Sequence, residues 1–129
     1  MSLAPGEWLD GLAAHGDASP ALRCGEVTLS WAGLAAMGRA CVDALDAAGV
    51  RAGDLLAVLA SPSAEGVALI HAALAARVPM LPLNARLSEP EQILALESSR
   101  ARFLLVDAAD DHARPVSYTH LTLPTIYPV

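Results

Sequence analysis

The chain contains no lysine, and its arginines do not cluster. With a net charge of −6 and no basic run, the composition argues against nucleic acid as a partner. Cysteine is scarce too. Cys24 and Cys41 form no C-x-x-C pair and match no metal-ligand spacing, which favours a reducing, cytoplasmic location. The first residues lack the basic region and long apolar core of a signal peptide.

Long apolar runs are also missing. A membrane-spanning helix needs roughly 20 consecutive apolar residues. The longest run here covers residues 67–76 and contains His71. The sequence therefore predicts no membrane span.

Glycine loops that bind phosphate are absent. Neither G-x-x-x-x-G-K-[ST] nor G-x-G-x-x-G occurs. The segment 61–66 could occupy such a position, but it has a single glycine and no basic residue, so we do not expect it to bind phosphate. No G-x-S-x-G motif surrounds the serines that precede helical patterns or form turns, which are Ser30, Ser61, Ser63 and Ser88. Ser30 and Ser63 are predicted to be the N-caps of the helices that follow them.

The titratable residues give no metal site. None of the four histidines has a ligand-spaced partner; they are His15, His71, His112 and His120. His71 stands alone in an apolar helix, so we predict a hydrogen-bonded core histidine. The cysteines are predicted to be small packing residues rather than nucleophiles.

An acidic cluster follows the last predicted strand, at Asp107, Asp110 and Asp111. It has a faint similarity to the Mg²⁺ site of a receiver domain. That site would require a lysine, which this chain lacks. The cluster is therefore interpreted as an exposed, solvated loop.

Helical and strand patterns alternate along the rest of the chain. The predicted helices and strands cover about 5–15, 21–24, 27–29, 31–48, 55–60, 64–77, 78–83, 88–99 and 103–106. Short apolar strands that alternate with helices predict an α/β fold. We expect a small β-hairpin followed by a parallel βαβαβ sheet flanked by helices.

Two of the predicted helices differ in their apolar patterns. Residues 64–77 are apolar almost all round, which is typical of a helix deep inside a larger protein. In the next helix, Ser88 and Glu91 are spaced as a capping box, and Ile93, Leu94 and Leu96 are expected to form the apolar face. The isolated chain is therefore predicted to expose apolar surface and an open sheet edge, and to aggregate.

Three motifs follow one another in a characteristic order. Residues 27–31 (VTLSW) lead from a strand into a helix, residues 51–54 match R-x-G-D, and residues 82–87 match P-x-N-x-R-L. In this order they resemble the N-terminal subdomain of the adenylate-forming acyl-CoA synthetases, the AMP-binding ligases. The resemblance covers residues 26–107. Within the family, residues 70–92 are most similar to o-succinylbenzoate–CoA ligases, although residues 77–79 replace the usual glycine-alanine.

The resemblance implies a parent enzyme that uses ATP and Mg²⁺ to adenylate a carboxylic acid and then transfers the acyl group to CoA. In the family, the phosphate loop, the adenine motif and the catalytic lysine would all lie beyond residue 114. We therefore assign no catalytic, cofactor-binding or metal-binding residue here, and expect the chain itself to bind no cofactor and to be inactive. Two alternatives stay open: the adenylation domain of a peptide synthetase, and a stand-alone flavodoxin-like binding module.

The composition changes abruptly near residue 114. Every alanine lies before that point, whereas both tyrosines and three of the four threonines lie in residues 115–129. The string VSYTHLTLPT looks like translated sequencing-adapter read-through, so we interpret 1–114 as a truncated subdomain and 115–129 as a non-native tail. Such a tail should make few contacts with residues 1–107. The alternative is an edge strand over residues 118–126.

Overall fold

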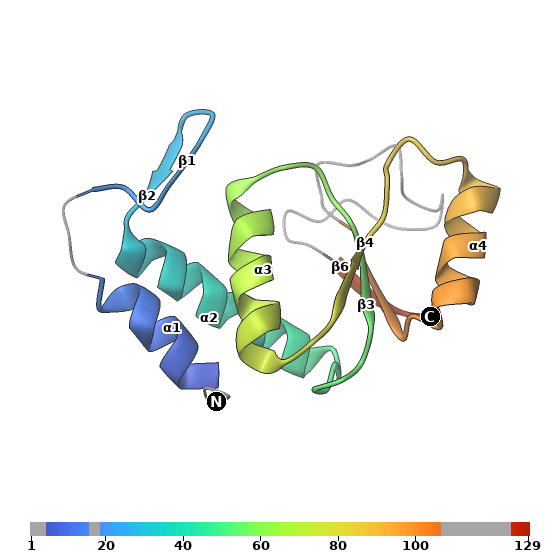
Figure 1. Ribbon diagram of the computed structural model, residues 1–129, viewed down its shortest axis with the longest axis horizontal. Coiled ribbons are helices and arrows are strands. Elements are labelled where there is room, and N and C mark those ends of the chain that lie inside the picture. The colour runs from blue at the N-terminus through green and yellow to red at the C-terminus, as the bar shows by residue number, and fades with distance from the viewer. Residues whose placement is uncertain (1–4, 16–18, 107–124) are drawn as a thin grey trace. The chain divides into compact units, whose positions relative to one another are not determined.

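The computed structural model describes residues 5–15, 19–106 and 125–129. These residues form a mixed α/β fold of helices, a small hairpin and one larger sheet (Figure 1). They divide into two compact units. One contains residues 1–52 and 62–78, and the other contains residues 53–61 and 79–129.

The first unit is a helical cluster with a hairpin. Its elements are α1 (Pro5–Ala13), β1 (Leu22–Cys24), β2 (Val27–Leu29), α2 (Trp31–Ala47) and α3 (Ala64–Ala76). The predicted hairpin is confirmed: β1 and β2 pair antiparallel around a tight turn in which Gly25 has a φ of +58°. The helices α1, α2 and α3 pack against one another.

Helices α1 and α2 approach each other closely at Gly38. A Cβ atom at this position would lie 2.8 Å from Leu9 Cδ2, closer than real side chains allow. Leu9 is only 2% exposed, so it has little room to move. The glycine therefore permits α1 to lie directly against α2.

The boundaries of α2 follow from local chemistry. Ser30 Oγ accepts a hydrogen bond of 3.0 Å from the Gly33 amide, which confirms the predicted N-cap. Gly49, just beyond the helix, has a φ of +87°, the left-handed conformation that often ends helices. On the inner face of α2, Leu34 and Leu45 are buried and Met37 and Cys41 are half-buried.

The second unit is a sheet with one helix. It contains β3 (Leu56–Leu59), β4 (Met80–Pro82), α4 (Glu89–Ser99), β5 (Phe103–Val106) and β6 (Thr125–Pro128). The strand order is β4-β3-β5-β6, and β3 pairs parallel with both β4 and β5. The predicted parallel arrangement is thus confirmed for three strands. All four residues of β3 are buried, as expected for a central strand.

Strand β6 corrects two expectations. It pairs antiparallel with β5, with Leu104 opposite Tyr127 and Leu105 opposite Ile126, so the sheet is mixed rather than wholly parallel. The expectation of few tail contacts is therefore wrong for residues 125–129, since β-compatible side chains there complete a ladder. A strand is present over Thr125–Pro128, which overlaps the alternative edge strand at residues 125 and 126; the rest of that predicted strand lies outside the described residues. The foreign origin of the tail stays a prediction.

Residues 107–124 lie outside the described part of the chain. The acidic cluster at Asp107, Asp110 and Asp111, together with His112 and His120, falls there. The interpretations given for those residues stay predictions.

Both edge strands of the sheet carry a proline. In β4, the Leu83 amide donates to Val58 O, so the backbone nitrogen of the neighbouring Pro82 faces away from β3. In β6, the Val129 amide donates to Arg102 O, so the nitrogen of Pro128 likewise faces away from β5.

Two of the three residues of the predicted apolar face of α4 are exposed. Ile93 is 47% exposed and Leu94 is 64% exposed, and α4 has no buried residue. Of the three residues of that face, Leu96 is half-buried. In the described residues, no helix is both long and apolar enough to cross a bilayer.

Candidate functional site

The carboxyl ends of the parallel strands are the natural place for a site. The chain passes from β3 to β4 on one side and then to β5 on the other, so the connection reverses direction across β3. Ligands of open α/β sheets bind outside the carboxyl ends at such a reversal. Within the unit that holds the sheet, the described chain at that end comprises Ala60 and Ser61 after β3 and the turn that follows β4.

The loop after β3 contains the residue that begins α3. Ser63 Oγ accepts a hydrogen bond of 3.0 Å from the Gly66 amide, which makes Ser63 the predicted N-cap. Pro62 has no amide hydrogen to offer. Glu65 adds a negative charge to the first turn, where an anion would otherwise be attracted. The residues described here therefore do not fit the phosphates of ATP, and we assign no catalytic step to them.

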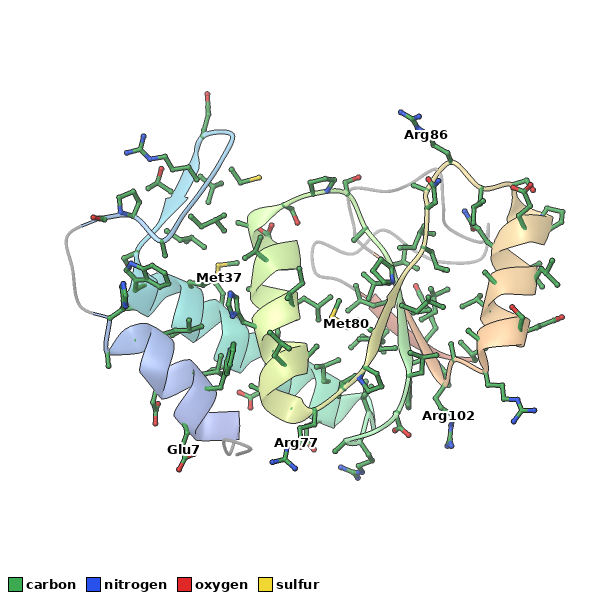
Figure 2. The ribbon with its side chains drawn as sticks, in the orientation of Figure 1. Glu7, Met37, Arg77, Met80, Arg86 and Arg102 are labelled. Carbon is green, nitrogen blue, oxygen red and sulfur yellow. The ribbon has the colours of Figure 1, made fainter. Side chains whose placement is uncertain are left out.

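The turn after β4 carries the P-x-N-x-R-L motif. Asn84 Oδ1 accepts from the Arg86 amide at 2.9 Å, and Asn84 O accepts from the Leu87 amide at 3.1 Å. The motif is thus a compact, self-bonded turn. Arg86 is exposed and points away from the chain (Figure 2).

The same turn leads into the capping box of α4. The Ser88 amide donates to Glu91 Oε2 at 2.8 Å, and the Glu91 amide donates to Ser88 Oγ at 3.4 Å. Both predicted halves of the box are confirmed. Gln92 Nε2 also donates to Leu87 O at 3.2 Å. The motif and the box together set where α4 begins.

The R-x-G-D motif is a second structural turn. Gly53 has a φ of +88°, a conformation that side chains rarely adopt. Arg51 Nη1 lies 3.2 Å from Asp46 Oδ1, and both side chains are largely exposed. This motif therefore connects α2 to β3 rather than forming a binding site by itself.

The predicted hydrogen bond of His71 is found, but the residue is not in the buried core. It is half-buried on α3, and its Nδ1 accepts a hydrogen bond of 3.3 Å from Trp8 Nε1 on α1. The two ring centroids are 6.2 Å apart. Sequence reasoning missed the partner, because 63 residues separate the pair and no spacing rule relates them.

The other candidate residues are dispersed. His15, just after α1, lies against Trp31, with ring centroids 4.3 Å apart. Cys24 and Cys41 are both free and half-buried. Burial, followed by the charge of Glu65, raises the pKa of the Cys41 thiol, so the reactive thiolate is disfavoured. Within residues 5–15, 19–106 and 125–129, no group of three or more His, Cys, Asp or Glu side chains is placed to hold a metal ion.

Comparisons with known proteins point in one direction. A family model described as "AMP-binding enzyme" matches residues 11–125. The 2-succinylbenzoate–CoA ligase of Bacillus subtilis is 37% identical over 82 residues, which are 64% of this chain and 17% of that protein. The chain therefore spans 17% of the length of this relative.

Solved structures share the fold. The o-succinylbenzoate coenzyme A synthetase (MenE) of Bacillus subtilis in complex with AMP superposes with a TM-score of 0.73 at 33% identity, over 82% of this chain and 28% of that chain. The inhibitor-bound N-terminal domain of FACL13 from Mycobacterium tuberculosis gives a TM-score of 0.72 at 27% identity, over 88% of this chain and 29% of that chain. Coronafacic acid ligase from Pectobacterium brasiliense, at 17% identity, shows the fold alone, with a TM-score of 0.74 over 86% of this chain and 22% of that chain.

Proposed function

Because this chain belongs to the AMP-binding enzyme family, we propose that it is the N-terminal part of an AMP-forming acid–CoA ligase. The observation that carries the proposal is the 37% identity to 2-succinylbenzoate–CoA ligase over 82 residues. The proposed substrate is an aromatic carboxylic acid of the o-succinylbenzoate class, and the compartment is the cytoplasm.

The parent reaction has two steps. A substrate carboxylate attacks the α-phosphorus of ATP and releases pyrophosphate, and the CoA thiol then displaces AMP from the acyl carbonyl. Positive charge, from Mg²⁺ and basic side chains, stabilises the first transition state. This chain has no lysine, and its loop after β3 uses Ser63 Oγ and the Gly66 amide for capping. Its proposed role is therefore to scaffold the walls of the site, not to carry out adenylation.

The isolated chain gives the first test. Purified protein is assayed for ATP–pyrophosphate exchange with o-succinylbenzoate, substituted benzoates and fatty acids. We expect no exchange above background. Acid-dependent exchange by the isolated chain would show that the catalytic groups lie within it.

A chimera gives the second test. Residues 1–106 replace the matching segment of the Bacillus subtilis ligase, and the hybrid is assayed with the same acids. We expect exchange with o-succinylbenzoate, followed by thioester formation with CoA. A folded hybrid that accepts only other acids would overturn the substrate class. Acyl transfer only to a carrier-protein thiol would instead favour a peptide-synthetase adenylation domain.

Self-association in solution distinguishes part of a larger ligase from a stand-alone binding module. Large apolar side chains are exposed on both α3 and α4, namely Ile70 (49%), Leu74 (56%), Ile93 (47%) and Leu94 (64%). We propose that the isolated chain self-associates and binds a hydrophobic dye such as ANS. A monodisperse monomer with a sharp cooperative melt and no dye binding would favour the stand-alone module.

A further inference from the structure

Helix α4 contacts its own unit through the less apolar of its two sides. Four residues at helical spacing are half-buried, namely Gln92, Ala95, Leu96 and Ser99. Gln92 Nε2 donates to Leu87 O at 3.2 Å, and the Ser99 hydroxyl donates to Leu96 O at 3.1 Å. Of these four residues, Leu96 alone has a large apolar side chain. Half of the inner side of α4 is therefore polar.

The opposite side of α4 is the more apolar one. Pro90, Ile93 and Leu94 follow one another at helical spacing, so they share a face, which we call the outer face of α4. All three are exposed, Ile93 by 47% and Leu94 by 64%. A surface helix normally turns its apolar face toward the protein. The reversed pattern of α4 favours an interface at its outer face.

Carboxylates surround the outer face of α4. Glu89 and Glu91 lie one turn before it, and Glu97 lies one turn after it. All three glutamates are exposed, and within the described residues none of them forms an ion pair. The helix contains no basic residue, and Arg100 follows its end. The rim of the outer face is therefore negative.

A second copy of the chain is a poor partner for the outer face. In a two-fold dimer the same surface meets itself. The glutamates at the rim of one copy would then face those of the other, and juxtaposed like charges weaken association. The net charge of −6 adds to this repulsion. A complementary partner has an apolar surface with basic groups around it.

We propose that the outer face of α4 is the surface on which the remainder of the parent ligase docks, through an apolar patch with arginine or lysine side chains at its rim. This rests on the proposed function. The similar o-succinylbenzoate coenzyme A synthetase is a much longer protein, of which this chain covers 28%. Docking would place α4 between its own unit and the rest of the ligase, and would bury Ile93 and Leu94.

Alkylation of a cysteine on the outer face measures whether it is covered. Leu94→Cys is made in the 129-residue chain and in the hybrid that carries residues 1–106 within the Bacillus subtilis ligase. Labelling of this position by iodoacetamide is followed by peptide mass spectrometry. A buried thiol reacts more slowly than an exposed one, so we expect labelling to be about tenfold slower in the hybrid. In urea, where both proteins are unfolded, the two rates should be equal.

Charge reversal at the rim tests the chemistry of the partner. Glu97→Arg, added to Leu94→Cys, should increase the labelling rate several-fold in the hybrid, because it places like charges together. The same change should leave the rate in the 129-residue chain unaltered. Glu97→Gln is the matched control, since it removes the charge and keeps the size, and it should give a smaller increase. Equal rates for all three rim residues in the hybrid would contradict a basic partner.

Failure of this proposal and failure of the proposed function give different results. A hybrid that catalyses ATP–pyrophosphate exchange but is labelled at position 94 as fast as the 129-residue chain would overturn the docking surface alone. A folded hybrid without exchange would contradict the proposed function. A discrete dimer of the 129-residue chain with position 94 protected would assign the face to a second copy.

A hybrid that does not fold is replaced by the Bacillus subtilis ligase itself. The cysteine is then placed at the aligned position of the intact ligase and of its own N-terminal fragment. The same difference in labelling rate is required between the two. Equal rates would overturn the proposal.

Discussion

Helices α3 and α4 begin and end alike, yet they differ completely in burial. Each starts at a serine N-cap, Ser63 or Ser88, and each ends at an arginine with a φ of 59°, Arg77 or Arg100. Six residues of α3 are buried, whereas none of α4 is. Helix boundaries are thus set by local backbone chemistry, while burial depends on what the neighbouring elements cover.

Side-chain size accounts for part of the difference. The buried face of α3 consists mostly of alanines, including Ala68 and Ala72, both fully buried. Alanine allows close approach and keeps high helix propensity. The α4 helix has bulkier residues at positions such as Leu94, which is 64% exposed. Four predictions test how far this comparison extends.

The largest expected change in the free energy of unfolding comes from shortening a leucine side chain. Leu69 on α3 is 5% exposed, so Leu69→Ala should lower the free energy of unfolding by about 2–5 kcal/mol. Leu94→Ala on α4 should change it by no more than about 0.5 kcal/mol. Urea denaturation of the full chain measures both. Equal midpoints for the two variants would contradict the contrast in burial.

Deletion of residues 115–129 should destabilise the unit that contains α4 more than the unit that contains α3. The deletion takes away β6, with half-buried Ile126 and Tyr127, from the unit that contains α4. We expect a loss of about 1–3 kcal/mol, from side chains that are partly buried. Amide hydrogen exchange should accelerate in β5 and not in α3. Unchanged exchange in β5 would show that the tail contributes nothing to the sheet.

The serine caps should make nearly equal contributions in both helices. Ser63→Ala and Ser88→Ala should each cost about 0.5–2 kcal/mol, because each leaves a first-turn amide without its acceptor. Ser98→Ala, on the exposed side of α4, is the matched control and should have little effect. Ser99 is unsuitable because its hydroxyl accepts from the Ala101 amide at 3.3 Å. A cap effect in only one helix would argue that burial modifies these boundaries.

The smallest effect concerns the arginines that end the helices. Among the described residues other than glycine, only Arg77 and Arg100 have a positive φ. Arg77→Gly and Arg100→Gly should each raise the free energy of unfolding by up to about 1 kcal/mol, because glycine adopts this conformation without steric cost. Arg86→Gly serves as control and should not stabilise. The melting temperatures of the three variants test this prediction.

Much of the fold could be predicted from local signals. Ser30, Ser63 and Ser88 mark helix starts because a hydroxyl satisfies an amide a few residues ahead. Gly49 marks a helix end because it adopts a left-handed conformation readily. The endings at Arg77 and Arg100 could not be predicted in the same way, since arginine is not typical of that conformation.

Features that depend on distant residues escaped prediction. The helical pattern of α4 predicted an apolar face at Ile93 and Leu94, but a pattern cannot show that the described residues leave this face exposed. Strand β6 pairs with residues 19 to 25 positions away, and Trp8 meets His71 across 63 positions. For the candidate site, the sequence correctly identified the capping role of Ser63 and the hydrogen-bonded state of His71.

The prolines at the two sheet edges limit how copies of this chain can associate. An incoming strand binds a sheet through a row of outward N–H and C=O groups. In β4, Pro82 removes one of these donors, and in β6 Pro128 removes another, so neither edge is a continuous template. Growth by strand addition is thereby blocked at both ends. Among the described residues, the exposed apolar side chains of α3 and α4 then provide the contacts between molecules, so we expect amorphous, dye-binding clusters and not cross-β fibres.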